Sequence, residues 1–172
     1  MKKIIKMKTL LRSKFIVLFS FILYFNISCN NRESFTPKER SLVQDSVQFM
    51  VESIAKNISN EGPIVWLRYF ENAPEFYMAS DGQLVFPNID SATSFINNKL
   101  INLMPDIQLR WSNIRIDPLT INLAGISAAF HEDITNSTGQ MTPHDGYFTG
   151  IAHQTSRGWK LHNAHWSSIV TR

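Results

Sequence analysis

The chain has 172 residues, 44% of them hydrophobic and 18% charged, which fits one ordinary domain with no repeat or low-complexity tract. Six of its 17 cations lie in the first fourteen residues, and all 14 acids follow residue 28. Residues after 28 therefore carry 11 cations and 14 acids, a net charge of −3 with histidine neutral. This balance gives no basis for nucleic-acid binding, and the single cysteine excludes an internal disulfide.

The N-terminal segment has the layout of a secretory signal. The cationic stretch is followed by an apolar run from Phe15 to Phe25, and then by Ser28 and Cys29. The run is shorter than the roughly 18 residues that span a bilayer. A small residue followed by cysteine resembles the lipobox of bacterial lipoproteins, although Asn26 stands where leucine is usual. The resemblance implies cleavage before Cys29 and lipid attachment to it.

These features divide the chain into three parts. We interpret residues 1–28 as a cleaved signal peptide, residues 29–35 as a tether and residues 36–172 as the folded domain. The implied location is the bacterial cell envelope, with the protein anchored to a membrane by lipid on Cys29. Plain secretion and an uncleaved membrane anchor are the alternatives.

The first helix of the domain has clear ends. Thr36 and Glu39 form a capping box, and Pro37 occupies the first helical position. Apolar residues then recur at spacings of three and four: Val43, Val47, Met50, Ile54 and Ile58. Gly62-Pro63 ends the helix.

Two shorter helices and a hairpin follow. A helix fits Ile64 to Phe70, and another fits Asp90 to Met104. Between them, Phe76 to Ala79 and Gln83 to Phe86 flank Asp81-Gly82, a strong hairpin signal.

The second half of the domain reads as strands. They are predicted over Ile107 to Asp117, Thr120 to Ile134, Met141 or Gly146 to Thr155, and Trp159 to Val170. Helices segregated from antiparallel strands favour an α+β fold over a parallel α/β sheet.

This order of elements, with Gly158-Trp159-Lys160-Leu161-His162-Asn163-Ala164-His165-Trp166-Ser167 near the end, resembles the SnoaL-like branch of the nuclear transport factor 2-like superfamily. The resemblance implies a cone-shaped half-barrel, in which three N-terminal helices and a short hairpin accompany a curved, mostly antiparallel sheet around one pocket. It covers residues 36–172. Asn163 departs from the pattern, because a second histidine is common there. The superfamily hosts isomerases, cyclases and dehydratases as well as binding and assembly domains, so fold alone does not set the chemistry.

Alternation along the last strand gives a candidate catalytic residue. Strand side chains alternate between faces, so His165 shares a face with Asn163 and Ser167, and with Trp159 and Leu161. We expect this face to line the pocket, where His165 would act as general acid or base. The alternative is a buried histidine with a purely structural role.

The opposite face of that strand carries Trp166. An outward Trp166 suggests a homodimer through the convex side of the sheet, and the alternative is a locally covered aromatic residue.

The five histidines lie between residues 131 and 165, yet they predict no metal site. His162 and His165 point to opposite faces of a strand. His131 and His153 come from different strands and lack a Cys or carboxylate partner. His144 is expected in a loop. No metal and no cofactor are therefore predicted.

No paired carboxylates, nucleophile elbow, P-loop or dinucleotide fingerprint is present. Glu132 and Asp133 are expected at a solvated rim. The residues expected to wall the pocket are Trp66, Phe70, Tyr77, Trp111, His131, Asn163 and Ser167. Such a pocket suits a small apolar or amphipathic ligand.

Three functions remain open from the sequence. The first is an envelope-anchored ligand-binding or accessory domain without a catalytic set, the second a small lyase or isomerase using His165, and the third a structural dimerisation module.

Overall fold

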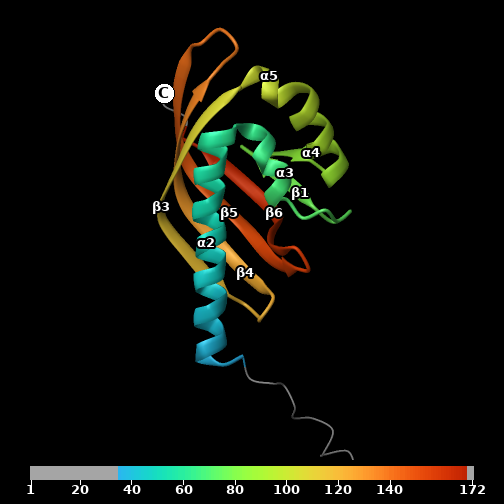
Figure 1. Cartoon of the computed structure of the whole chain (residues 1–172), viewed down its shortest axis with the longest axis vertical. Helices are drawn as coiled ribbons and strands as arrows, with labels where there is room; N and C mark the ends of the chain where they lie inside the picture. Colours follow the sequence, from blue (N-terminus) through green and yellow to red (C-terminus); the bar gives the residue numbers. More distant parts are fainter. Residues whose placement is uncertain (1–34, 170–172) are drawn as a thin grey trace, which may run out of the picture. The chain divides into compact units, whose positions relative to one another are not determined.

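The structure is a computed structural model and describes residues 35–169 (Figure 1). The expected signal peptide and Cys29 lie outside these residues. Within residues 35–169, no helix is long and apolar enough to cross a membrane.

The long helix α2 (Pro37–Glu61) begins at the expected capping box. The Thr36 hydroxyl accepts a hydrogen bond from the Glu39 backbone N–H at 3.2 Å, and Glu39 Oε2 accepts one from the Thr36 N–H at 2.7 Å. The predicted apolar stripe is buried, together with Val51. The helix ends at Gly62, whose φ of 81° lies in a region that favours glycine. The predicted helix is confirmed at both ends.

The other short elements follow the prediction closely. They are the 3₁₀ turn η1 (Pro63–Val65), α3 (Trp66–Tyr69), β1 (Tyr77–Ser80), β2 (Gln83–Phe86), α4 (Ile89–Phe95), the π-helix η2 (Ile96–Leu100) and α5 (Ile101–Leu103). The single helix predicted over Asp90 to Met104 is thus interrupted by a π-helical turn. The hairpin at Asp81-Gly82 is present.

The main strands are β3 (Asp106–Pro118), β4 (Leu123–Thr135), β5 (Met141–Thr155) and β6 (Gly158–Ser168). They build a six-stranded sheet in the order β2-β1-β6-β5-β4-β3. Every pairing is antiparallel except that of β1 with β6. The sheet curves around α2 and the α3 to α5 region, as Figure 1 shows. The predicted α+β fold with a curved, mostly antiparallel sheet is confirmed.

The register shifts in three strand pairs of the sheet, which are β1–β2, β3–β4 and β5–β6. In β3 the register shifts between Ser112 and Arg115, where Asn113 has a φ of 52°. In β6 the register runs from Ile151↔Asn163 to Ala152↔Leu161, so His162 is an extra residue in the strand. Such β-bulges bend a strand and re-aim its side chains. The bulge in β6 decides which side chains reach the interior.

Candidate functional site

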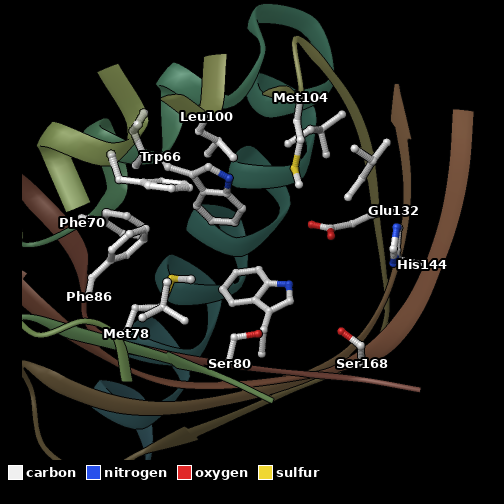
Figure 2. A pocket seen from close by; sticks show the side chains of 16 residues that line it. Trp66, Phe70, Met78, Ser80, Phe86, Leu100, Met104, Glu132, His144 and Ser168 are labelled. Carbon is white, nitrogen blue, oxygen red and sulfur yellow. The ribbon is translucent and has the colours of Figure 1, made fainter. Parts of the chain in front are cut away.

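The candidate site is a cavity of about 350 Å³ between the inner face of the sheet and the short helices. Figure 2 shows aromatic and aliphatic side chains on most of its wall, with Glu132, His144 and Ser168 on one side. The apolar lining comprises Trp66, Phe70, Met78, Val85, Phe86, Phe95, Ile96, Leu100, Met104, Ile107, Ile134 and Trp166. The polar lining comprises Ser80, Glu132, His144 and Ser168. A mostly apolar cavity with a few polar groups is the usual form of a small-molecule site.

Strand alternation carries Glu132 into the cavity. Ala124, Ile126, Ala128 and Phe130 of β4 are all buried on the inner face. Glu132 is the next residue of that set, and Figure 2 shows its carboxyl group pointing toward the middle of the cavity. The expectation that Glu132 lies at a solvated rim is therefore wrong. The signal that would have found it was the run of small and apolar residues at every second position of β4.

Burial raises the pKa of Glu132 to about 7. Charged groups lose solvation in an apolar cavity, so the neutral acid is favoured. Within residues 35–169, the Glu132 side chain makes no hydrogen bond with another residue. Near neutral pH the group can therefore donate a proton or accept one.

His144 faces Glu132 from the neighbouring strand. The two residues are register partners in the β4–β5 pair, which places their Cβ atoms about 4.5–5.5 Å apart in sheets generally. His144 belongs to β5, so its expected loop position is wrong. His144 is exposed to solvent and also lines the cavity, which places it at an opening of the cavity.

The two serine hydroxyls of the cavity are already paired. Ser168 Oγ donates to Asp81 Oδ2 at 3.3 Å, and Ser80 Oγ donates to the same oxygen at 3.1 Å. Ser168 N–H also donates to Asp81 Oδ1 at 2.7 Å, and this bond is the main reason that the pKa of Asp81 is lowered. Glu132 and His144 are therefore the cavity groups best placed to bond a ligand.

The β6 bulge moves the predicted catalytic residue out of the site. Leu161 points inward as expected, but the extra residue His162 shifts the alternation by one position. His165 and Ser167 are consequently exposed on the outer face, and neither lines the cavity. Asn163 Oδ1 accepts a hydrogen bond from the Ile151 N–H at 3.1 Å, so its side chain bonds to the backbone of the neighbouring strand β5 instead of lining the cavity. The predicted orientation of His165, Asn163 and Ser167 is wrong.

The same shift turns Trp166 inward. It is only 9% exposed and lines the cavity, against the expectation of a convex-face residue. Its ring centroid lies 4.5 Å from that of Phe148 and 5.1 Å from that of Trp66. The part of the dimer hypothesis that relied on Trp166 is therefore removed.

The remaining predicted pocket residues divide between cavity, core and surface. Trp66 and Phe70 line the cavity. Trp111 packs in the core, where its Nε1–H donates to Val51 O at 2.9 Å. Tyr77 is 44% exposed and does not line the cavity. His131 also lies outside it, because its neighbour Phe130 is the inward residue of β4.

His131 belongs to a surface network of charges. Its Nδ1 lies 2.7 Å from Asp145 Oδ1, and its Nε2 lies 3.2 Å from Asp133 Oδ1. Asp133 in turn accepts a hydrogen bond from Arg110 at 2.9 Å. The bond with Asp145, and to a lesser degree that with Asp133, raises the pKa of His131. The arginine already balances one of the carboxylates, so the network reads as a surface ion-pair cluster.

A second histidine cluster joins residues that the sequence does not bring together. Glu71, His153 and His162 present oxygen and nitrogen atoms that all lie within 4.8 Å of one another. Burial opposes ionisation of Glu71, but hydrogen bonds with His153 and His162 outweigh it and lower the pKa of the carboxyl group. This carboxylate partner of His153 could not be predicted from the sequence, because Glu71 lies 82 positions away along the chain.

No protein-family model and no curated protein sequence matches the chain. Solved structures do match it. An NTF2-like superfamily protein from Salmonella enterica has a TM-score of 0.58 at 14% identity, covering 78% of this chain and 93% of its own. A hexachlorocyclohexane dehydrochlorinase of LinA type 2 has a TM-score of 0.61 at 10% identity, covering 77% and 89%. A protein provisionally named a scytalone dehydratase, from Novosphingobium aromaticivorans, has a TM-score of 0.62 at 11% identity, covering 74% and 85%.

These likenesses define the class of fold. The domain shares the α+β fold of these three proteins, one of which is an NTF2-like superfamily protein, and its cavity lies between the curved sheet and the helices. At these identities the similarity concerns the fold, and the chemistry rests on the cavity residues.

Proposed function

We propose that the protein binds a small, mostly apolar molecule that carries one hydrogen-bonding group. The observation that carries this proposal is the carboxyl group of Glu132, which has no hydrogen-bond partner within residues 35–169, in an otherwise largely apolar cavity of about 350 Å³. Protonated Glu132 would donate to a carbonyl oxygen, and ionised Glu132 would accept from a hydroxyl or amine. The aromatic rings on the facing wall would hold the apolar body of the ligand.

A second candidate is a cofactor-independent lyase or isomerase of the SnoaL-like branch. The observation that favours it is the pKa of about 7 at Glu132, together with His144 on the adjacent strand. A general acid–base works best when its pKa lies near the operating pH. In this proposal Glu132 takes the role that the sequence suggested for His165. The fold is shared with a hexachlorocyclohexane dehydrochlorinase.

Native mass spectrometry of protein purified from cells tests the binding proposal. We expect a small molecule that remains under gentle conditions and is lost on unfolding. The variant Glu132→Gln keeps the side-chain shape and removes the ionisable group. Affinity should fall roughly 10- to 100-fold for a molecule that donates to the ionised carboxylate, as for loss of a hydrogen bond to a charged group. A molecule that accepts from the protonated acid should keep its affinity, because the glutamine amide also donates.

Glu52→Gln is the matched control, because Glu52 is exposed on α2 and should leave affinity unchanged. A protein that emerges empty, and that gives no calorimetric signal with 2-naphthol, would contradict the binding proposal. If the retained molecule is converted during incubation and Glu132→Gln abolishes the conversion, the lyase or isomerase candidate is favoured.

We propose further that the domain is anchored in the bacterial cell envelope by lipid on Cys29. This proposal is supported by the order of regions within residues 1–28, which are a cationic stretch, an apolar run and a small residue before Cys29. Cys29→Ser should move the protein from the membrane fraction to the soluble fraction. Retention of the variant in membranes would indicate an uncleaved anchor, and release of the unmutated protein into the medium would indicate secretion.

A homodimer through the outer sheet face remains a proposal, resting on residues other than Trp166. Tyr147 is 46% exposed there and pairs with Ser167, next to His165 on β6. Sedimentation velocity tests the dimer proposal by comparing the unmutated protein with the variant Tyr147→Lys. A dimer through this face should dissociate in the variant.

A further inference from the structure

We propose that Glu71, His153 and His162 form a binding site for a divalent transition-metal ion, with zinc as the best match. Glu71 Oε1 lies 2.8 Å from His153 Nδ1, and Glu71 Oε2 lies 2.7 Å from His162 Nδ1. Two imidazoles and one carboxylate are a ligand set of zinc sites that keep a further position for water. None of the three residues lines the cavity, so the site is independent of the proposed ligand.

Three separate segments deliver these side chains, and backbone pairing fixes each of them. Glu71 N–H donates to Leu161 O at 2.9 Å, next to the bridge between Phe70 and Leu161. His153 of β5 pairs with Lys160 of β6, so His162 is its diagonal neighbour on the adjacent strand. The ligand atoms are therefore brought together by the sheet itself.

One residue of the cluster lies at the bulge in β6. His162 is the residue that the bulge inserts between Leu161 and Asn163. Leu161 is fully buried, whereas the His162 side chain is 35% exposed and turned to Glu71. Bulges often re-aim a side chain beside a functional site. His162 thus lies at the irregularity that removes His165 from the cavity.

Charge and burial favour a cation at this place. The Glu71 side chain is only 12% exposed, and within residues 35–169 no Lys or Arg forms an ion pair with it. The nearby Lys160 Nζ donates instead to Arg68 O at 2.7 Å. With neutral imidazoles the cluster carries one negative charge, which a bound cation would balance. The histidines are about one third exposed, which leaves room for water to complete the coordination shell.

The competing explanation of the cluster is that two neutral imidazoles form hydrogen bonds with Glu71 and no metal binds. A zinc titration distinguishes this explanation from a metal site. Purified protein is treated with EDTA, dialysed, and titrated with ZnCl₂ by calorimetry, with Co²⁺ absorption as a spectroscopic check. We expect one ion per chain. Glu71→Gln and His162→Ala should each weaken binding by at least roughly 100-fold, because even loss of an outer partner of a ligand costs about 10- to 100-fold.

His165→Ala is the matched control, because it removes an exposed histidine of the same strand outside the cluster. It should bind zinc like the unmutated protein. Glu71→Gln preserves the shape of the side chain. Circular dichroism establishes whether each variant is folded, and His153→Ala is used in place of any variant that does not fold. Absence of zinc binding, or binding unchanged in all folded cluster variants, overturns the proposal.

Discussion

Replacing Trp166 by alanine is expected to cost about 3–5 kcal/mol of unfolding free energy, the usual range for truncating a buried aromatic residue. Trp166 is 9% exposed, and its ring lies within 6.1 Å, centroid to centroid, of the rings of Trp66, Phe148, Phe130 and Trp111. The substitution removes these contacts and enlarges the cavity that the indole lines. Thermal and urea unfolding followed by circular dichroism measure the loss, which should lower Tm by about 10 °C or more.

Phe49→Ala is the control for this prediction. Phe49 is 72% exposed on α2, so its truncation should change stability by no more than about 0.5 kcal/mol. Equal, small effects of the two substitutions would contradict the inward position of Trp166. Such a result would mean that Trp166 lies on the outer face, as alternation without a bulge predicts.

The position of Trp166 shows why part of the site was predicted wrongly from the sequence. Uninterrupted alternation from Trp159 predicts the faces of the strand correctly as far as Leu161. One inserted residue then exchanges the two faces of the strand, because side chains alternate with a period of two. Nothing in the local sequence marks His162 as the insertion, since the bulge is defined by pairing with β5. A tertiary contact therefore decided the faces of His165 and Trp166.

Glu132 illustrates the opposite case, in which the signal was present in the sequence. The inward residues Ala124 to Phe130 occupy every second position, and continuing the pattern leads to Glu132. Its charge argued for solvent, because carboxylates are seldom buried without a partner. A cavity resolves the conflict, since the pKa of the group rises to about 7 and the neutral acid is tolerated.

The elements that depend on local rules were predictable. The α2 helix is set by a capping box and a glycine stop, and the hairpin is set by Asp81-Gly82. The cluster of Glu71, His153 and His162 was not predictable, because its three residues come from segments joined only by the sheet. Local chemistry thus specified the elements, whereas the site depends on how strands pair.

The stability of the protein is expected to fall as pH rises from about 4.5 to 8, through the ionisation of Glu132. Its pKa is about 7 in the folded state against an ordinary 4.5, so the folded protein binds more protons than the unfolded chain in this interval. The contribution is fully present below pH 4.5 and is lost as pH rises through 7. Its size is at most about 3 kcal/mol.

Glu132→Gln isolates this effect, because glutamine resembles the protonated acid and cannot ionise. Urea unfolding at a series of pH values should find the variant and the unmutated protein equally stable near pH 4.5. The variant should become more stable by up to about 3 kcal/mol at pH 8. The comparison cancels other titrating groups, such as His131, that both proteins share.

Two controls decide the cause of that difference. Glu52→Gln changes an exposed carboxylate and should give no comparable pH-dependent gain. His144→Ala removes the titratable group that faces Glu132 across the β4–β5 pair. If burial alone raises the pKa of Glu132, the Gln-minus-Glu difference persists in the His144→Ala background. A difference that is constant from pH 4.5 to 8 would instead mean that Glu132 is solvated, and it would remove the group on which the binding proposal depends.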